Sequence, residues 1–175
     1  MRIANVVSFG LIIVLISAAI AALGHSVSDA MNKGSYTEFY VLGVNGKAED
    51  YPQAFVLKDG QAVQVTLDTG AVISSNVSGQ LGEVTLALVN REHQTVTYLV
   101  DVSIDGVVVS TNVNGKSVLA VGPLEVADGQ EWKQKIGFAP QTAGSDQIVE
   151  FRLFEIGQQR VLKDTLRLHI NAVQQ

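Results

Sequence analysis

The chain contains 175 residues, with 12 basic and 17 acidic side chains and a formal net charge of −5 at pH 7. No basic patch or stripe stands out, so the sequence lacks the electrostatic footprint of a nucleic-acid-binding protein. It contains no cysteine, which excludes disulfides, thiolate metal sites and cysteine nucleophiles.

The sequence opens with a long apolar run, from Ile3 to Leu23, that contains no charged residue. As a helix rising ~1.5 Å per residue, this run extends about 31 Å, enough to cross the hydrocarbon core of a bilayer. We therefore predict a single transmembrane anchor over residues 1–24, a stalk over 25–35 and one domain over 36–175. Arg2 precedes the run, so the positive-inside tendency predicts a cytoplasmic N-terminus and an extracytoplasmic domain.

The same segment has a second interpretation, as a signal peptide with a weak cleavage site at Ser28-Asp29-Ala30 and a secreted product. The apolar run is longer than the roughly 7–15 residues of a signal-peptide core, which favours the anchor. Small residues on one side of the predicted span permit close packing on another membrane helix; they are Gly10, Ser17, Ala18 and Ala21.

From Tyr36 onward the apolar pattern changes to a period of two, which is typical of β-strands. The predicted strands are Tyr36–Leu42, Ala54–Leu57, Gln61–Asp68, Glu83–Asn90, Thr95–Ile104, Val107–Val113, Trp132–Phe138, Ile148–Ile156 and Val161–Val173. Tight turns are predicted between them at Asn45-Gly46, Asp105-Gly106, Asn114-Gly115 and Asp128-Gly129. Short strands at this spacing, with no amphipathic helix between them, predict an all-β fold, an antiparallel immunoglobulin-like β-sandwich behind the single N-terminal transmembrane helix.

The alternation also predicts the buried side chains, because residues two apart in a strand share one face. The predicted core consists of Phe39, Leu86, Leu88, Tyr98, Val100, Val102, Trp132, Ile136, Phe138, Phe151 and Leu153.

The block Tyr36–Pro52 (YTEFYVLGVNGKAEDYP) looks like the opening signature of domain-of-unknown-function family 1616, a group of predicted membrane proteins of archaea and some bacteria. It is the most specific of several blocks that resemble this family. Later blocks that resemble it are Leu88–Glu92, Thr97-Tyr98, Gly122–Leu124, Asp128-Gly129, Trp132, Phe151–Phe154 and Leu166–Ile170. The chain departs from the family in having one predicted span rather than several, and the family has no established activity. The resemblance therefore implies topology and fold.

The residues that carry chemistry give no catalytic or metal-binding pattern. The three histidines, His25, His93 and His169, lack metal-ligand spacing. Asp101, Asp105 and Glu92 are candidate oxygen ligands for a hard cation. The simpler interpretation is that Asp101 lies on the polar face of its strand and that Asp105 is a turn residue. No nucleophile elbow and no phosphate-binding glycine loop occurs in the sequence. We expect a protein that is not an enzyme and has no cofactor.

The signature residues are the main candidates for a contact surface: Tyr36, Glu38, Tyr40, Lys47, Asn90, Glu92 and Trp132. Period two places Tyr36, Glu38 and Tyr40 on one face, where they are either a contact for a sugar or protein partner or a half-buried structural ladder. We expect Glu38 to pair with Lys47 across the Asn45-Gly46 turn. Asn76 lies in the sequon Asn76-Val77-Ser78 and is the candidate glycosylation site.

These features predict a membrane-anchored, non-catalytic surface module that serves assembly or interaction, as an accessory subunit of a larger membrane complex. Its expected partners are membrane lipid and other membrane or cell-surface proteins, or further copies of itself, and not nucleic acid. Two alternatives remain: a pilin-like filament subunit and a cell-surface carbohydrate-binding module. Fold alone does not choose among them.

Overall fold

The computed structural model of this chain describes residues 34–59, 61–68, 71–73 and 81–175. Within these ranges the chain forms thirteen β-strands. The described residues include no helix that is long and apolar enough to span a membrane. The predicted anchor over residues 1–24 and nearly all of the stalk over 25–35 lie outside the described residues. Thr37–Gln175 form a compact unit of their own.

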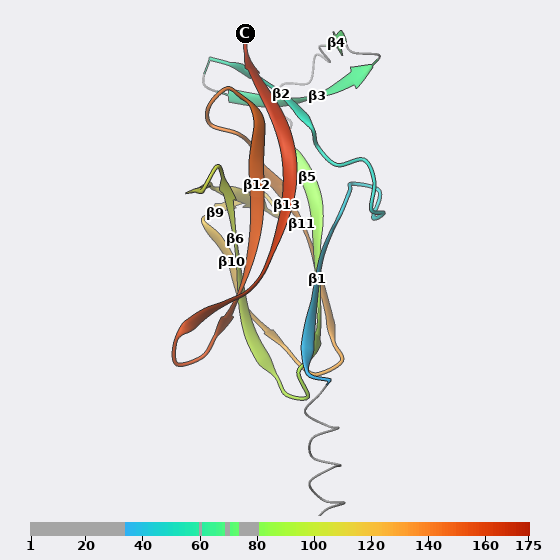
Figure 1. The fold of residues 1–175 in the computed structure, drawn as a ribbon, viewed down its shortest axis with the longest axis vertical. Coiled ribbons are helices and arrows are strands. Elements are labelled where there is room, and N and C mark those ends of the chain that lie inside the picture. The colour runs from blue at the N-terminus through green and yellow to red at the C-terminus, as the bar shows by residue number, and fades with distance from the viewer. Residues whose placement is uncertain (1–33, 60, 69–70, 74–80) are drawn as a thin grey trace, which may run out of the picture. The chain divides into compact units, whose positions relative to one another are not determined.

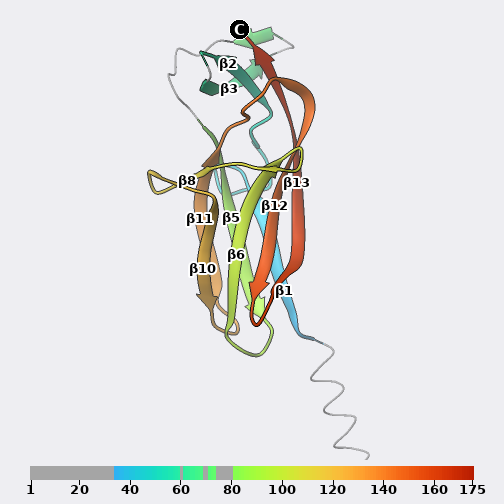
Figure 2. The same cartoon turned by 90° about the vertical axis from the view of Figure 1, so that its left-hand side faces the viewer.

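Two sheets face each other to form a sandwich-like arrangement (Figures 1 and 2). The first sheet contains, in spatial order, β1 (Tyr36–Leu42), β5 (Gly82–Arg91), β11 (Glu131–Phe138), β8 (Thr111–Val113) and β9 (Lys116–Val118). The second contains β10 (Ala120–Val126), β6 (Val96–Ile104), β12 (Gly144–Ile156), β13 (Arg160–Gln174), β2 (Ala54–Lys58), β3 (Gln61–Asp68) and β4 (Ala71–Ile73), with β7 (Val107–Val108) beside β6. The all-β prediction is therefore confirmed.

The core lies between the sheets, where alternate residues of each strand point inward. Tyr98 and Phe151 come from the second sheet and Phe138 from the first, and all three are fully buried. The rings of Phe138 and Phe151 meet edge-on with centroids 5.7 Å apart. All of the predicted core residues are buried except Trp132, which is partly buried and packs against the core.

The predicted strand Val107–Val113 is interrupted. β7 pairs with β6 in one sheet, whereas β8 pairs with β11 in the other, so the chain changes sheets at Val109 and Ser110. Val109 is buried and its N–H donates to the Val102 carbonyl, which holds the crossover against the core. A continuous alternation in sequence does not show such a change of sheet, because period two persists on both sides of it.

Two predicted hairpin turns have the expected backbone. Asp105 and Gly106 have φ of 49° and 80°, and Asn114 and Gly115 have φ of 52° and 81°, as two-residue turns with positive φ at both central positions require. The predicted Asn45-Gly46 turn forms as well, since the Gly46 N–H donates to the Gly43 carbonyl. It does not close a hairpin, however, because β1 and β2 belong to different sheets.

The second sheet is built around a long hairpin of β12 and β13, which turns at residues 157–159, between the two predicted strands Ile148–Ile156 and Val161–Val173. The far end of β13 then pairs with β2 in parallel, with Asn171 opposite Ala54 and Gln174 opposite Leu57. The expectation of a purely antiparallel sandwich is wrong at this pair. No local pattern in the sequence predicts this pairing, because most of the domain lies between the two strands in the sequence.

Candidate functional site

The first candidate site lies on the outer face of the first sheet, where β1 carries the signature residues. Phe39 is buried in the core, so its neighbours Glu38 and Tyr40 point to the other side of the sheet. Tyr36, the first residue of the strand, is 50% exposed. The period-two prediction is thus confirmed for this strand.

Polar side chains from three adjacent strands interact on this face. The Arg91 guanidinium of β5 lies 2.6 Å from the Glu38 carboxylate. The Tyr40 hydroxyl donates a hydrogen bond of 2.5 Å to Glu131 of β11, and the Lys133 ammonium lies 2.9 Å from the same carboxylate. We call these five residues the signature face. Because each is held by a neighbour, the face is ordered before any partner arrives.

Tyr40 and Glu131 of the signature face hold each other in one protonation state near neutral pH. The hydrogen bond to Glu131, together with partial burial and the nearby carboxylates, raises the pKa of Tyr40 to about 12. The same hydrogen bond and the Lys133 ammonium lower the pKa of Glu131. Tyr40 therefore remains a hydroxyl donor and Glu131 a carboxylate acceptor, and neither is set up to exchange protons with a substrate.

The expected Glu38–Lys47 pair does not form. Glu38 pairs with Arg91, whereas the Lys47 ammonium lies 3.5 Å from Glu49 within its own loop. The physical reason is the topology: β1 is hydrogen-bonded to β5, which brings Arg91 beside Glu38, while the chain after β1 leads to the other sheet. Both Lys47 and Glu49 are largely exposed, so their pair contributes little to stability.

A second cluster lies at the end of the sandwich where β1 begins, and we call it the end cluster. Thr37 of β1 donates from its hydroxyl to Glu92, 2.8 Å away, and also lies 2.8 Å from the Tyr98 hydroxyl. The Lys163 ammonium of β13 lies 3.2 Å from Glu92 and 3.0 Å from Glu155. Both carboxylates raise the pKa of Lys163, the Glu155 hydrogen bond most strongly. The cluster joins the two sheets through polar contacts.

Asn90 has a structural role beside the end cluster. Its side chain is fully buried, and its amide donates to the carbonyls of Gln94 and Val126 at 2.8 and 2.7 Å. Its side-chain oxygen accepts from the Glu92 N–H at 2.9 Å. Asn90 therefore shapes the turn that presents Glu92, and every polar atom of its side chain is used.

The candidate cation ligands are not brought together. Asp101 accepts from Arg152 at 2.7 Å and from Arg160 at 2.6 Å. Asp105 accepts instead from the Ile148 N–H and from the Gln147 amide, at the start of β12. The described ranges contain no group of three or more histidine, cysteine, aspartate or glutamate side chains placed to hold a metal ion.

The two described histidines lie far apart in the sequence and each faces a carboxylate. His93, in the turn after β5, has its Nδ1 3.7 Å from Asp128. His169 on β13 has its Nδ1 2.7 Å from Asp146. Both imidazoles are more than half exposed, which fits surface contacts better than metal ligation.

Sequence reasoning missed the arginines that neutralise Asp101. They come from β12 and β13, 51 and 59 positions further on. The Arg160 guanidinium also lies 3.6 Å from the centroid of the Phe154 ring, a cation–π contact. The signal in the sequence is an acidic residue in the middle of an apolar strand, which requires a buried partner.

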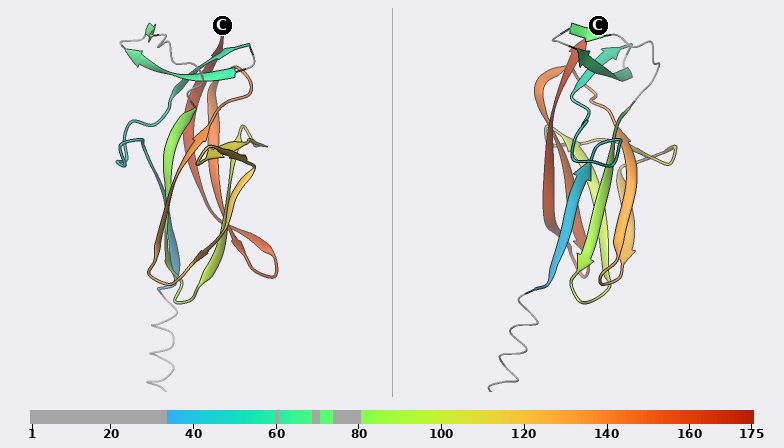
Figure 3. Two further views of the ribbon diagram at one scale, coloured as in Figure 1. Left: turned by 180° about the vertical axis from the view of Figure 1, so that it is seen from behind. Right: turned by 90° about the vertical axis from the view of Figure 1, so that its right-hand side faces the viewer.

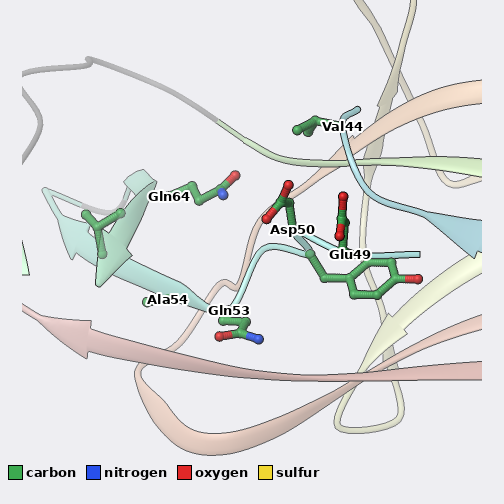
Figure 4. A pocket seen from close by; sticks show the side chains of 8 residues that line it. Val44, Glu49, Asp50, Gln53, Ala54 and Gln64 are labelled. Atoms are coloured by element: carbon green, nitrogen blue, oxygen red, sulfur yellow. The ribbon is translucent and has the colours of Figure 1, made fainter. Parts of the chain in front are cut away.

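A polar hollow of about 580 Å³ lies between the loop that follows β1 and the β2–β3 hairpin. Figure 4 shows the carboxylates of Glu49 and Asp50 side by side there, with Gln53 and Gln64 toward the hairpin. The Asn45 amide binds Asp50 at 2.8 Å, and the Tyr51 hydroxyl donates to the Val41 carbonyl at 3.0 Å. The hollow offers hydrogen bonds to a polar ligand, but its own loop contacts already use part of them.

Several predicted sites fall outside the described residues: the glycosylation candidate Asn76, the histidine His25 and the helix-packing residues Gly10, Ser17, Ala18 and Ala21. The remaining signature residue, Trp132, lies on β11 in register with Leu88 and packs on the core, so it belongs to the sandwich interior more than to a surface platform.

Comparison with known families identifies the family of the β-domain. Residues 72–170 match the family described as Domain of unknown function (DUF1616). The chain belongs to this family. Comparisons with curated proteins and with solved structures found no significant match.

The DUF1616 match begins in β4 and ends in β13, so it includes the strands that build most of both sheets. It contains Asn90, Glu92, Asp101 and Trp132. The block Tyr36–Pro52 lies before the matched residues, so membership in the family rests on the later blocks. The end cluster and the Asp101 site lie largely within the residues that match DUF1616, whereas β1 precedes them and contributes two of the five residues of the signature face.

Proposed function

We propose that this protein is a membrane-anchored, non-catalytic interaction module, with an immunoglobulin-like sandwich outside the cytoplasm and the signature face as its contact surface for another protein. The observation that carries this proposal is the row of interacting side chains from β1, β5 and β11 on that face. The five side chains of the signature face hold each other in fixed positions. Binding of a partner to them therefore loses little side-chain entropy.

The composition of the face supports protein binding. Tyrosine and arginine are enriched at protein interfaces, because both combine a large contact area with hydrogen bonding. The face alternates in charge across the strands, which favours a partner of complementary pattern over lipid or nucleic acid. Nothing in the protonation of Tyr40 or Glu131 favours proton-transfer chemistry on this face.

The anchoring rests on the uncharged run Ile3–Leu23. We expect the chain to remain with membranes after high-salt and carbonate washing, and the domain to be accessible to protease added from outside the cell. Release of a chain shortened by the N-terminal segment would support the signal-peptide alternative. Replacing Gly10 and Ala18 with leucine tests whether the span packs on other helices, because larger side chains prevent close approach.

The contact surface is tested by charge reversal at Glu131, with chemical crosslinking in native membranes followed by purification in mild detergent. Glu131→Lys removes the acceptor of Tyr40 and places like charges together on the face. We expect the crosslinked assembly to be lost. The matched control is Glu125→Lys, an exposed glutamate on β10 of the other sheet, which should leave the assembly intact. Equal crosslinking of both variants and wild type, with folding unchanged, would reject the signature face as the interface.

A further inference from the structure

The closed end of the hairpin of β12 and β13 extends one residue pair and a turn past the last residue of β12 that pairs with β6. β6 accompanies β12 only as far as the pair Glu155–Tyr98, whereas β12 and β13 stay paired to Ile156–Arg160. We call residues 156–162 the hairpin tip. Figures 1 and 3 show this part of the hairpin swinging away from the other strands. Val161 and Leu162 pair with Glu155 and Phe154, which β6 still flanks, so only the Ile156–Arg160 pair and the turn between these two residues lie past β6.

The hairpin tip exposes apolar side chains. Val161 and Leu162 are each 53% exposed, and because they are consecutive in a strand they point to opposite sides of the ribbon. The tip sequence IGQQRVL contains no acidic residue and one basic residue, in a chain whose net charge is −5. The Arg160 guanidinium is held back at the base by Asp101 and Phe154, so Val161 and Leu162 are left uncovered.

The tip projects from the end of the sandwich at which β1 begins. Thr37, the second residue of β1, binds Glu92, and Glu92 binds Lys163 at the base of the hairpin. Residues 24–35 join the predicted span to β1, and twelve residues reach at most about 43 Å when fully extended. If the span lies in a bilayer, the chain length therefore keeps the start of β1 within about 43 Å of the end of the span.

We propose that the hairpin tip docks on the surface of the bilayer that holds the predicted span, with Val161 and Leu162 at the level of the lipid headgroups. This inference rests on the membrane anchoring of the proposed function. Exposed aliphatic side chains at the closed end of a hairpin gain from leaving water at that depth, and the tip's lack of acidic residues avoids repulsion by anionic lipid. The docked hairpin gives the sandwich a second attachment and limits its rotation about the stalk.

The absence of cysteine in the chain permits a direct test with single labels. The full chain with Leu162→Cys is labelled with an environment-sensitive fluorophore and reconstituted in vesicles of neutral and anionic phospholipid. A fraction of the lipids carries a nitroxide at the headgroup. The matched control is Lys58→Cys, at the end of β2, because β13 runs from the hairpin to β2 and so places this residue at the other end of the sandwich.

We expect a blue-shifted emission and at least twofold quenching by nitroxide lipid for the label at position 162, and the emission of a water-exposed dye at position 58. Equal, unquenched emission at both positions would overturn the docking. Energy transfer between labelled copies at position 162 without lipid quenching would assign the tip to a contact between two copies, and would overturn it as well. Flotation of the same samples separates the two proposals: a chain that does not float with the vesicles refutes the anchoring, whereas one that floats with an unquenched label refutes only the docking.

Discussion

The Asp101 carboxylate and the Arg160 guanidinium lie 2.6 Å apart, although they come from strands separated by β12. Asp101 is nearly buried, with 7% of its side chain exposed, whereas the Arg160 side chain is 44% exposed. Arg152 binds the other oxygen of the same carboxylate. Asp101, a candidate cation ligand in the sequence, therefore links three strands of the second sheet through ion pairs.

Asp101→Asn tests this crosslink. The substitution removes the buried charge and replaces one carboxylate oxygen with an NH2 donor, so one of the two guanidinium groups loses its acceptor and the other keeps only a neutral one. We expect a loss of about 2–4 kcal/mol in the free energy of unfolding, below the full cost of breaking a buried pair because both arginines reach solvent. Urea denaturation measures it. The control Asp59→Asn changes an exposed aspartate in the β2–β3 turn and should have little effect. Equal stability of the two variants would contradict the structural role.

Phe138→Ala should be more damaging than Trp132→Ala. Phe138 is fully buried between Phe55 and Phe151, with ring centroids at 6.1 and 5.7 Å, so its truncation should cost about 3–5 kcal/mol. Trp132 is only partly buried, and we expect a smaller loss, roughly 1–3 kcal/mol, because less surface leaves water there. Thermal and urea unfolding compare the two. A larger loss for Trp132 would reverse this ranking.

Asn90→Ala should destabilise the domain by about 2–3 kcal/mol, because it leaves two carbonyls and one N–H near the turn without their partner. Gln94→Ala is the matched control. Gln94 contributes only its backbone carbonyl to this contact, so its truncation should change stability by less than about 0.5 kcal/mol. Hydrogen exchange of residues 91–94 provides a local measurement, and unchanged protection in Asn90→Ala would contradict the prediction.

Tyr40 should ionise late in an alkaline titration followed by tyrosinate absorbance. Its pKa is raised to about 12 from 10.0, first by the Glu131 hydrogen bond. A pKa raised in the folded state favours the protonated form, so this contribution to stability is full below about pH 10 and is lost as the pH rises toward 12. Glu131→Gln should move the Tyr40 ionisation to lower pH, whereas Glu125→Gln should not. If Tyr40 ionised at the same pH in Glu131→Gln as in the wild type, the Glu131 hydrogen bond would not be the cause of its raised pKa.

Lys163→Met should weaken the end cluster. The Glu92 side chain is only 13% exposed, so loss of the ammonium leaves a nearly buried carboxylate with one hydroxyl partner. We expect a loss of about 1–3 kcal/mol. Lys116→Met, on the exposed edge strand β9, should change stability by less than about 0.5 kcal/mol. Urea unfolding at low and high salt measures the free energy of unfolding. If high salt abolished the loss of stability in Lys163→Met, the pair with Glu92 would behave as an exposed surface pair and not as a half-buried one.

The strands were predictable wherever one side chain in two is apolar. β1 and β3 have the predicted bounds, because β-forming residues end at Gly43 in one case and lie between turn residues in the other. The core was predictable for the same reason, apart from Trp132. The change of sheet at Val109 was not, since alternation continues through it. The parallel pairing of β13 with β2 has no local signal at all.

The candidate site was predictable in part. Period two correctly placed Glu38 and Tyr40 on the face opposite Phe39. Their partners were not predictable, because Arg91 and Glu131 come from strands whose order in the sheet is set by the whole fold. Proximity across the Asn45-Gly46 turn wrongly favoured Lys47. The same limit applies to Asp101, whose arginines come from distant strands.

The parallel pair of β2 and β13 also sets a temporal order for folding. β2 and β3 form a local hairpin early in the sequence, but their place in the second sheet exists only after β13 has been synthesised. Until then the free edge of that hairpin is available to any other strand, including one from a neighbouring nascent chain. Non-local pairing of this kind slows folding. The nascent chain is therefore most open to mispairing just before β13 emerges.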